Sequence, residues 1–242
     1  QPVVWGELID ILSVQKEELN NFIDSIYEKH EHVRVILTGA GTSAFIGDTL
    51  VPVLTRENNA NVQFDAVPTT QIVSNPEEYF QKDVPTILVS FARSGNSPES
   101  VATVTLGHQI VDQFYQVVIT CNKEGQLAKD TKGDENAVTI LMPEKSNDKS
   151  LAMTSSFTCM LITAYTLFTS NELDKRVITY AEEFIETLMD KLHGVLGFDF
   201  ERVIYLGSGL LSQLSHEAAL KMLELTAGKV VAIHESSLRS EE

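Results

Sequence analysis

Residues 86–100, TILVSFARSGNSPES, decide the fold of this chain. The first six form an apolar run typical of a buried strand, and the remainder reads as a loop that opens a helix. Ser97 is a favourable N-cap residue, and Pro98 fits the first helical position after it. The unpaired N–H groups of such a helix start attract anions, so this loop is a candidate phosphate site. Its candidate residues are Ser94, Gly95, Asn96 and Ser97.

An ordinary turn is the alternative interpretation of the same loop. Ser, Gly and Asn are common wherever a strand connects to a helix, because they satisfy turn geometry and cap helices. The loop taken by itself leaves both interpretations open.

Apolar runs and helical patterns alternate on both sides of this loop. The predicted strands are residues 33–38, 62–67, 86–91, 116–120 and 137–142, and the predicted helices cover about 44–54, 69–74, 97–112 and 151–168. Strands separated by helical segments of this length form right-handed βαβ units. The sequence therefore predicts an α/β fold, a three-layer, doubly wound, five-stranded parallel sheet.

The whole chain divides into four predicted regions. Residues 1–31 carry apolar side chains at helical spacing and predict an N-terminal helical arm that packs against another domain or subunit. Residues 32–170 hold the predicted sheet, and residues 171–197 predict an amphipathic connecting helix. In residues 198–242 the order of strand, glycine-containing turn and helix returns, which indicates an internal duplication. Two strands and one helix are too few for a core of their own, so we expect this second domain to be present only in part.

The charge balance excludes several classes of partner. Lys and Arg number 18 against 34 Asp and Glu, and the net charge is −16. A chain this acidic repels nucleic acid and anionic membranes, so we expect neither as a partner. Cys121 and Cys159 lack the spacing of a metal site or a disulfide framework, which favours a reducing, cytoplasmic location. Metal-ligand spacing is absent among the histidines as well, and those expected at the surface are His32, His108, His193 and His216.

A second loop of small residues, GAGTSA at positions 39–44, follows the first predicted strand. Its spacing fits the G-x-G-x-x-A pattern of dinucleotide-binding folds, and Asp65 lies where those folds place a ribose-binding acid. The pattern alone is weak evidence for a dinucleotide. Two such loops at strand ends of one sheet meet in the crevice where the strand order reverses, which favours one compact ligand. The candidate residues of the second loop are Gly41, Thr42 and Ser43.

A third helix start rich in hydroxyl groups lies in residues 150–158, SLAMTSSFT. Ser and Thr at helix starts are mostly caps, so this signal is weak by itself. Together with the other two loops, Thr154 and Ser155 would close a ring of hydroxyl groups around a polyol.

The helix predicted in residues 215–228, SHEAALKMLELTAG, carries the candidate acid–base residues. Glu217, Lys221 and Glu224 lie on one narrow stripe, while apolar side chains fill most of the remaining circumference. A helix that is apolar almost all round is expected to be buried, with its charged stripe facing a cleft. A carboxylate there, partly buried beside an ammonium group, is a candidate general base. The alternative is an ion pair of Glu217 with Lys221, with Glu224 in solvent.

Four segments of the chain resemble one known family. They are ILTGAGTSAFIGD at 36–48, SFARSGNSPES at 90–100, NDKSLAMTSSFTCML at 147–161 and HEAALKMLELTAGKVVAIHESSL at 216–238. Together they resemble the AgaS group of sugar isomerase (SIS) domain proteins. That group comprises tagatose-6-phosphate ketose/aldose isomerases, also described as galactosamine-6-phosphate deaminase/isomerases.

The resemblance implies tandem SIS domains, each a five-stranded parallel sheet between helices, and assembly into homodimers or larger homo-oligomers. It implies that Ser43, Ser94 and Ser97 contact the phosphate group. It implies that Glu224 moves a proton between C1 and C2 of the sugar, with Lys221 at a neighbouring position of the motif. In this family a Gly-Phe-Arg-His-Gly-Pro-like segment follows, whereas here Leu238 is followed by Arg-Ser-Glu-Glu.

The sequence thus predicts a sugar-phosphate isomerase or deaminase that acts on a hexose or hexosamine 6-phosphate and needs no metal or redox cofactor. The alternative is a non-catalytic SIS module that binds a sugar phosphate and serves regulation, which the departure after Leu238 favours.

Overall fold

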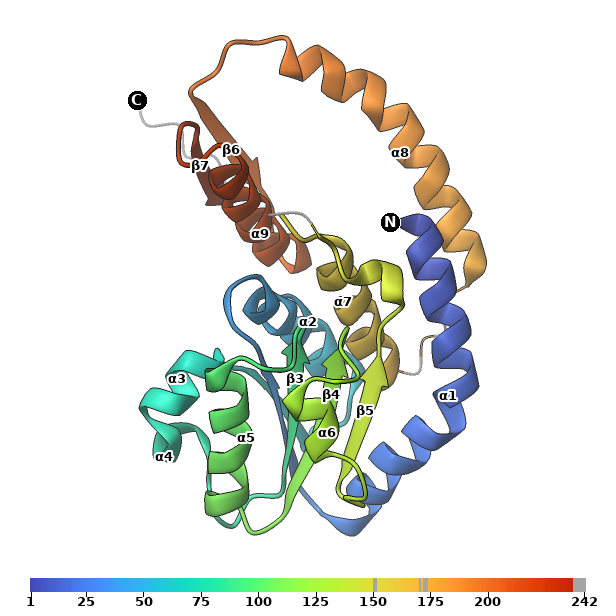
Figure 1. The fold of residues 1–242 in the computed structure, drawn as a ribbon, viewed down its shortest axis with the longest axis vertical. Helices are drawn as coiled ribbons and strands as arrows, with labels where there is room; N and C mark the ends of the chain where they lie inside the picture. The colour runs from blue at the N-terminus through green and yellow to red at the C-terminus, as the bar shows by residue number, and fades with distance from the viewer. Residues whose placement is uncertain (150–151, 170, 172–173, 237–242) are drawn as a thin grey trace.

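Two separate parallel sheets organise the computed structural model of the protein (Figure 1). The structure describes residues 1–149, 152–169, 171 and 174–236. The larger sheet has five strands in the order β2-β1-β3-β4-β5, and every neighbouring pair is parallel. This arrangement confirms the predicted doubly wound α/β fold. The strands are β1 (Val33–Thr38), β2 (Val62–Ala66), β3 (Thr86–Ala92), β4 (Phe114–Thr120) and β5 (Ala137–Leu141).

Helices cover both faces of the five-stranded sheet, which gives the three layers that the sequence predicts. Successive strand residues point to opposite faces, so Leu37 and Val89 pack with one group of helices, and Ile36 and Leu88 with the other. The first group is α1 (Pro2–Lys29), α2 (Ala44–Glu57) and α7 (Ser155–Phe168). The second group is α3 (Thr69–Ser74), α4 (Pro76–Tyr79), α5 (Pro98–Ile110) and α6 (Gln126–Asp130).

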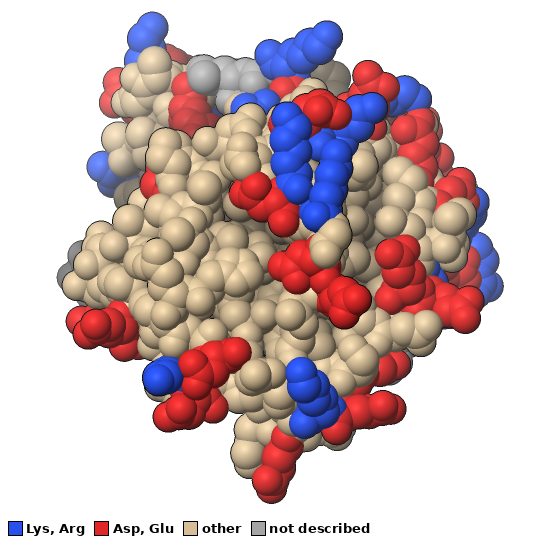
Figure 2. All heavy atoms as spheres, turned by 60° about the horizontal axis from the view of Figure 1, so that its bottom comes forward, with Lys and Arg blue, Asp and Glu red and all other residues tan. Residues whose placement is uncertain are grey.

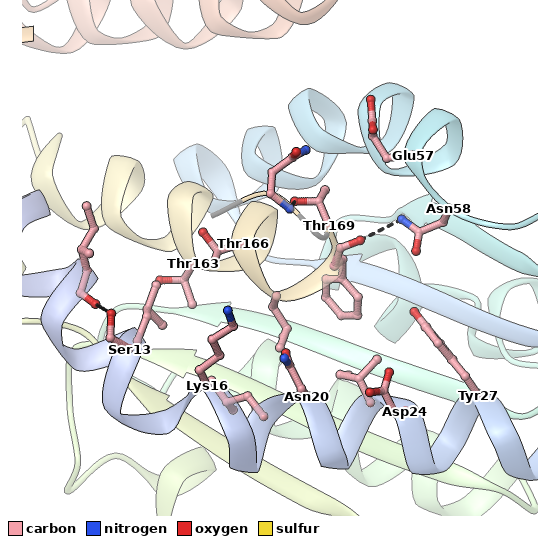
Figure 3. A pocket seen from close by; sticks show the side chains of 17 residues that line it. Ser13, Lys16, Asn20, Asp24, Tyr27, Glu57, Asn58, Thr163, Thr166 and Thr169 are labelled. Atoms are coloured by element: carbon pink, nitrogen blue, oxygen red, sulfur yellow. Dashed lines mark hydrogen bonds between the residues drawn. The ribbon is translucent and has the colours of Figure 1, made fainter. Parts of the chain in front are cut away.

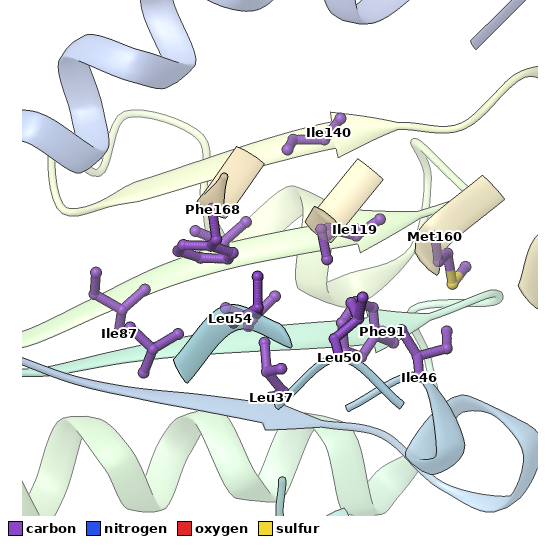
Figure 4. Close-up of a cluster of buried hydrophobic side chains, with 14 of the residues drawn as sticks. Leu37, Ile46, Leu50, Leu54, Ile87, Phe91, Ile119, Ile140, Met160 and Phe168 are labelled. Atoms are coloured by element: carbon purple, nitrogen blue, oxygen red, sulfur yellow. The ribbon is translucent and has the colours of Figure 1, made fainter. Parts of the chain in front are cut away.

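The larger of the two cores lies between the sheet and the α1, α2 and α7 layer (Figure 4). Leu50 and Leu54 of α2 share this core with Ile87 and Phe91 of β3. Every residue of β3 and β4 is buried, which explains why their sequences are almost continuously apolar instead of alternating. The two central strands therefore give a rigid base to the loops that follow them.

α1 runs along the sheet and is tied down near both ends. Trp5 Nε1 donates a hydrogen bond to Thr158 Oγ1 of α7 at 2.9 Å, and Lys29 Nζ donates to the Tyr115 hydroxyl of β4 at 3.1 Å. Between these contacts its apolar side chains enter the larger core. The N-terminal arm therefore packs on the chain's own sheet.

α8 (Lys175–Leu196) projects from this body and carries an exposed apolar face. The side chain of Asp174 caps it, since its Oδ1 accepts the N–H of Arg176 at 2.8 Å. The first turn lies against α1, where Lys175 Nζ is 2.5 Å from Asp10 Oδ1. Farther along, large side chains such as Phe184 are in solvent.

The smaller sheet pairs β6 (Arg202–Leu206) with β7 (Val231–Glu235), and α9 (Leu210–Leu225) connects the two strands. α9 returns to the first body and packs on α2 (Figure 1). The expectation that α9 is buried almost all round is wrong, because Leu211 is 57% exposed and Leu225 64%. Two strands and α2 cover only part of its circumference, so the remaining apolar side chains stay in solvent.

α7 begins at Ser155, whereas the sequence predicted a start near residue 151. Asp148 explains the difference, because its Oδ2 accepts the N–H groups of Thr154 at 2.8 Å and Ser155 at 2.7 Å. A carboxylate at a helix start is stabilised by the helix dipole, so this contact fixes the first turn. Residues 150 and 151 of the prediction lie outside the described residues.

Among the helices that the structure describes, none combines the length and the apolar character needed to cross a membrane. In the same described ranges, no group of three His, Cys, Asp or Glu side chains is placed to hold a metal ion.

Candidate functional site

The loops after β1 and β3 follow neighbouring strands at the carboxyl edge of the five-stranded sheet. The strand order reverses here, because β2 lies on one side of β1 and β3 on the other. In sheets of this kind, ligands bind in the crevice at that point. Each loop contains a glycine in the left-handed region, Gly41 with φ of +57° and Gly95 with φ of +66°. The backbone therefore turns sharply just before each helix begins.

The β1–α2 loop contains the predicted residues Gly41–Ser43 as one short 3-10 turn. The N–H of Ser43 donates to the carbonyl of Ala40 at 3.2 Å, and α2 begins at the next residue. The carbonyl of Gly39 accepts the N–H of Thr69 at 2.9 Å, which ties the loop to α3. No side chain in the described part of the chain caps α2, so its first N–H groups are left for an anion.

The β3–α5 loop is braced by the loop that follows β4. Asn122 Nδ2 donates to the carbonyl of Ser94 at 2.8 Å, and Asn96 Oδ1 accepts the N–H of Gln126 at 2.8 Å. A Cβ atom added at Gly125 would lie 2.6 Å from the Ser94 carbonyl oxygen, so the close approach requires glycine. Sequence reasoning missed this brace, although Asn122, the second residue after β4, is a polar residue near a strand end like those of the predicted loops.

Ser97 is the N-cap residue of α5, as its position in the sequence predicts, yet its hydroxyl group does not cap the helix. The hydroxyl donates to Ser100 Oγ at 2.7 Å instead. In the described chain the first N–H groups of α5 therefore have no side-chain cap. α2 and α5 thus present two open helix starts at the same edge of the sheet.

The start of α7 offers a different environment. The N–H groups of Thr154 and Ser155 are occupied by Asp148, and Thr154 Oγ1 accepts a hydrogen bond from Gln1 Nε2 at 2.5 Å. This third helix start is thus satisfied by the chain itself. What Thr154 and Ser155 still offer to a ligand is their hydroxyl groups.

Arg93 is the one basic residue in the sequence of the two loops, 39–43 and 93–97. Its Nη1 donates to Asn147 Oδ1 at 3.3 Å, which links the β3–α5 loop to the segment before α7. Apart from Arg93, the groups that these loops offer to an anion are hydroxyl and N–H donors.

α9 brings the predicted acid–base residues together. Lys221 Nζ lies 2.5 Å from Glu224 Oε2 and 3.5 Å from Glu217 Oε1, so it bridges the two carboxylates. The alternative of one Glu217–Lys221 pair with Glu224 alone in solvent is therefore wrong. The side chain of Glu217 is 8% exposed and that of Glu224 is 35% exposed.

Glu217 is the carboxylate that lies beside the β1–α2 loop. Burial raises the pKa of Glu217, while Lys221 and a hydrogen bond from the Thr42 hydroxyl act in the opposite direction. Its Oε2 atom is buried without a hydrogen-bond partner among the described residues. Glu224 follows seven residues later, about 10 Å farther along the helix axis. Glu217 is therefore the better placed of the two toward the loop, and Glu224 is the more accessible.

His216 is half-buried, which corrects the expectation of a surface residue. Its ring packs against Phe45 of α2, with 4.3 Å between the centroids, and stacks on His234 of β7 at 3.9 Å. Burial lowers the pKa of His216, His234 lowers it further, and Asp48 acts in the opposite direction. The ring partners are far apart in the sequence, so no local pattern indicates this contact.

Asp65 forms an ion pair with Arg34 inside the chain. Its Oδ2 accepts hydrogen bonds from Arg34 Nε at 2.6 Å and from Gln63 Nε2 at 2.8 Å. The carboxylate is thus engaged within the sheet, and the dinucleotide alternative loses the acid that would bind the ribose.

A hollow of about 670 Å³ lies away from these loops, between α1, α7 and the end of α2 (Figure 3). Polar side chains line much of it, among them Asn20, Tyr27 and Asn58. Asn58 follows the last residue of α2, so the hollow is at the opposite end of that helix from the β1–α2 loop. Its wall includes Thr169 and Asn171, which follow α7 in the sequence.

The face shown in Figure 2 carries many acidic side chains, as the composition of the chain leads one to expect. Asp and Glu side chains spread over this face, and Lys and Arg side chains are interspersed with them. The face shown therefore has no continuous basic surface of the kind that binds nucleic acid.

Comparison with known families decides the classification. The family model of the SIS domain matches residues 27–170. The chain belongs to the SIS domain family. The match ends at the last residue predicted for the first domain and begins earlier than residue 32, within α1.

Curated relatives of this SIS chain carry one name. The chain is 42% identical to the D-galactosamine-6-phosphate deaminase AgaS of Escherichia coli, over 98% of this chain and 62% of that protein. It is 40% identical to the D-galactosamine-6-phosphate deaminase AgaS of Shewanella sp. (strain ANA-3), with the same coverage. These identities confirm the predicted resemblance to the AgaS group. The chain spans about 62% of the length of these relatives.

Solved structures agree with the fold of the SIS chain. The tagatose-6-phosphate ketose/aldose isomerase from Escherichia coli matches with a TM-score of 0.89 and 41% identity, over 97% of this chain and 65% of that one. The glucosamine-6-phosphate deaminase from Thermotoga maritima matches with a TM-score of 0.65 over 95% of this chain and 70% of that one. At 19% identity, the second likeness shows the fold alone.

Proposed function

We propose that this SIS chain supplies the phosphate site and the acid–base residues of a sugar-phosphate isomerase or deaminase. The observation that carries the proposal is the packing of α9 on α2, where His216 of α9 lies against Phe45 in the first turn of α2. It places a buried carboxylate beside a helix start that is open to an anion. The proposed substrate is a hexose or hexosamine 6-phosphate, which the names of the AgaS relatives and of the structurally similar tagatose-6-phosphate isomerase support.

The phosphate group binds at the starts of α2 and α5 in this proposal. Hydroxyl groups of Ser43, Ser94 and Ser97 donate to it, that of Ser97 in place of its bond to Ser100, together with N–H groups of the two helix starts. The remaining loop residues, Gly41, Thr42, Gly95 and Asn96, bring the backbone close to the bound group. Thr154 and Ser155 contribute their hydroxyl groups toward the sugar.

Glu224 takes the proton from C2 of the open-chain sugar, and the electron pair moves toward C1, where O1 takes up a proton. An enediol results, or an enolamine when C2 carries nitrogen. Return of a proton to C1, with loss of a proton from the oxygen or nitrogen on C2, gives the 2-keto sugar or an imine at C2, and water hydrolyses the imine with release of ammonia. Lys221, 2.5 Å from Glu224, stabilises its carboxylate, and Glu217 holds Lys221 from the other side. The steps move only protons and water, so they call for no metal or redox cofactor.

The decisive experiment follows exchange of substrate hydrogen with deuterated water by NMR, at C2 of galactosamine 6-phosphate and at C1 of tagatose 6-phosphate. We expect Glu224→Gln to slow exchange about 10²- to 10⁴-fold with nearly unchanged affinity, because the amide keeps the shape but accepts no proton. Glu182→Gln, on the exposed surface of α8, is the matched control and should exchange at the parent rate.

Two outcomes would change the proposal. Parent-rate exchange in Glu224→Gln, with loss in Glu217→Gln, would transfer the role of base to the carboxylate beside Thr42. Tight binding by the parent without any exchange would favour the non-catalytic regulatory module.

We also propose that the protein assembles as a homodimer or larger homo-oligomer in the cytoplasm, with neither nucleic acid nor membrane as a partner. Exposed apolar side chains on α8 and α9 support an assembly, because contiguous apolar surface favours association. The free thiols of Cys121 and Cys159 support a reducing compartment. The net charge of −16 opposes binding to anionic polymers and surfaces.

A further inference from the structure

Three rings from three separate elements meet where the smaller sheet contacts the larger body. The His216 ring of α9 lies against Phe45 of α2, with 4.3 Å between centroids and an interplanar angle of 49°. It stacks on His234 of β7 at 3.9 Å, with an interplanar angle of 15°. The His216 ring is therefore in contact with one ring from each of two other elements.

This ring cluster lies next to both halves of the candidate site. Phe45 is the second residue after Ser43 of the β1–α2 loop, and His216 directly precedes Glu217. Leu214, one turn before Glu217, packs against the larger core and anchors the same part of α9. A rotation of α9 that separates the rings therefore also shifts Glu217 relative to Thr42.

We infer that His216 is a positioning residue of the acid–base site, held between Phe45 and His234 so that the Glu217–Lys221–Glu224 stripe faces the β1–α2 loop. The inference rests on the proposed function for its catalytic consequence. The proton transfer then depends on a ring contact that lies outside the charged stripe.

The charge state of His216 gives this role a pH dependence. The groups that face its ring are Asp48 from α2 and His234 from β7, and Glu217 is its neighbour on α9. Burial and His234 lower the pKa of His216, so the neutral ring is the form that the folded contact favours. The contact is intact above the ordinary histidine pKa of about 6.5 and is lost as the pH falls through the lowered pKa. Acidification therefore loosens α9 at the loop.

The test compares the parent chain with His216→Ala, which removes the ring, and His216→Phe, which keeps an aromatic ring that cannot take a proton. C2-hydrogen exchange on galactosamine 6-phosphate is measured between pH 5.5 and 8. At pH 7.5 we expect His216→Ala to lose about 10- to 100-fold in exchange rate, the scale of a small misplacement of reacting groups. His216→Phe should restore the rate at pH 7.5 and lack the decline of the parent below about pH 6.5. His193→Ala, exposed on α8, is the control and should follow the parent at every pH.

Amide hydrogen exchange of α9 at pH 7.5 provides a readout that does not depend on activity. Faster exchange in His216→Ala, with parent-like exchange in His216→Phe, supports the ring contact. If the parent does not exchange the C2 hydrogen, the proposed function fails, and the amide exchange alone decides whether His216 holds α9. If His216→Ala matches the parent in amide exchange, or in C2 exchange where the parent is active, the inference is overturned.

Discussion

Most hydrogen-bond donors in the candidate phosphate site are uncharged hydroxyl and N–H groups. Arg93, the only basic residue of the two loops, is already linked to Asn147. Ser94 has its carbonyl held by Asn122, so its backbone is fixed and its hydroxyl is placed before α5. A phosphate bound here would gain its affinity from charge-assisted hydrogen bonds, each worth more than a neutral one.

Ser94→Ala should weaken binding of galactosamine 6-phosphate by about 1–3 kcal/mol, because one charge-assisted hydrogen bond is lost. Calorimetric titration of the parent and the variant measures the difference. Ser25→Ala is the matched control, since that hydroxyl is exposed on α1 and donates to the carbonyl of Phe22. Equal affinities for parent and Ser94→Ala would remove Ser94 from the site.

α2 is the element that joins the core to the site. Its first turn follows the β1–α2 loop, and farther along Leu50 and Leu54 enter the larger core (Figure 4). Gly47 lets the helix lie close to the sheet, because an added Cβ would be 3.0 Å from Leu37 Cβ and 3.1 Å from Ala66 Cβ. Packing of α2 thus determines where the loop sits.

Leu50→Ala should lower the free energy of unfolding by about 2–5 kcal/mol, since Leu50 is 1% exposed and its loss leaves a cavity. Leu196→Ala makes the same chemical change at an exposed position and should shift stability by no more than about 0.5 kcal/mol. Denaturant titration of both variants gives the comparison. Similar midpoints for the two would show that α2 is not packed as described.

Local patterns in the sequence predict the elements well where burial is complete, and poorly where a distant residue intervenes. The apolar runs of β1 and β3 give their position and their parallel arrangement, because central strands are buried on both faces. The start of α7 depends on the side chain of Asp148, and the burial of His216 depends on Phe45 and His234. These contacts connect residues from different elements, so they cannot be predicted from the periodicity or the capping residues of one segment.

At the scale of the whole molecule, two helix pairs in the described part of the chain link the body of the larger sheet to the C-terminal elements. α8 lies on α1, and α9 lies on α2. Both cores of buried residues belong to the larger body, and of α9 only Leu214 packs against either. The smaller sheet has no hydrophobic core of its own among the described residues.

A fragment of residues 198–242 should therefore show no cooperative thermal unfolding by circular dichroism, because a two-stranded sheet and one helix bury too little apolar surface. A fragment of residues 1–170, which contains the larger sheet with its flanking helices, should unfold in one cooperative transition. A sharp transition in the 198–242 fragment would show that it folds independently.

α8 also acts as a lever between these two contacts. It has 22 residues and is about 33 Å long, so a tilt of about 10° at its first turn displaces its far end by about 6 Å. The smaller sheet follows that far end, while α9 is seated on α2. A small tilt of α8 on α1 would therefore become a larger displacement at the smaller sheet, and the packing of α9 on α2 opposes it.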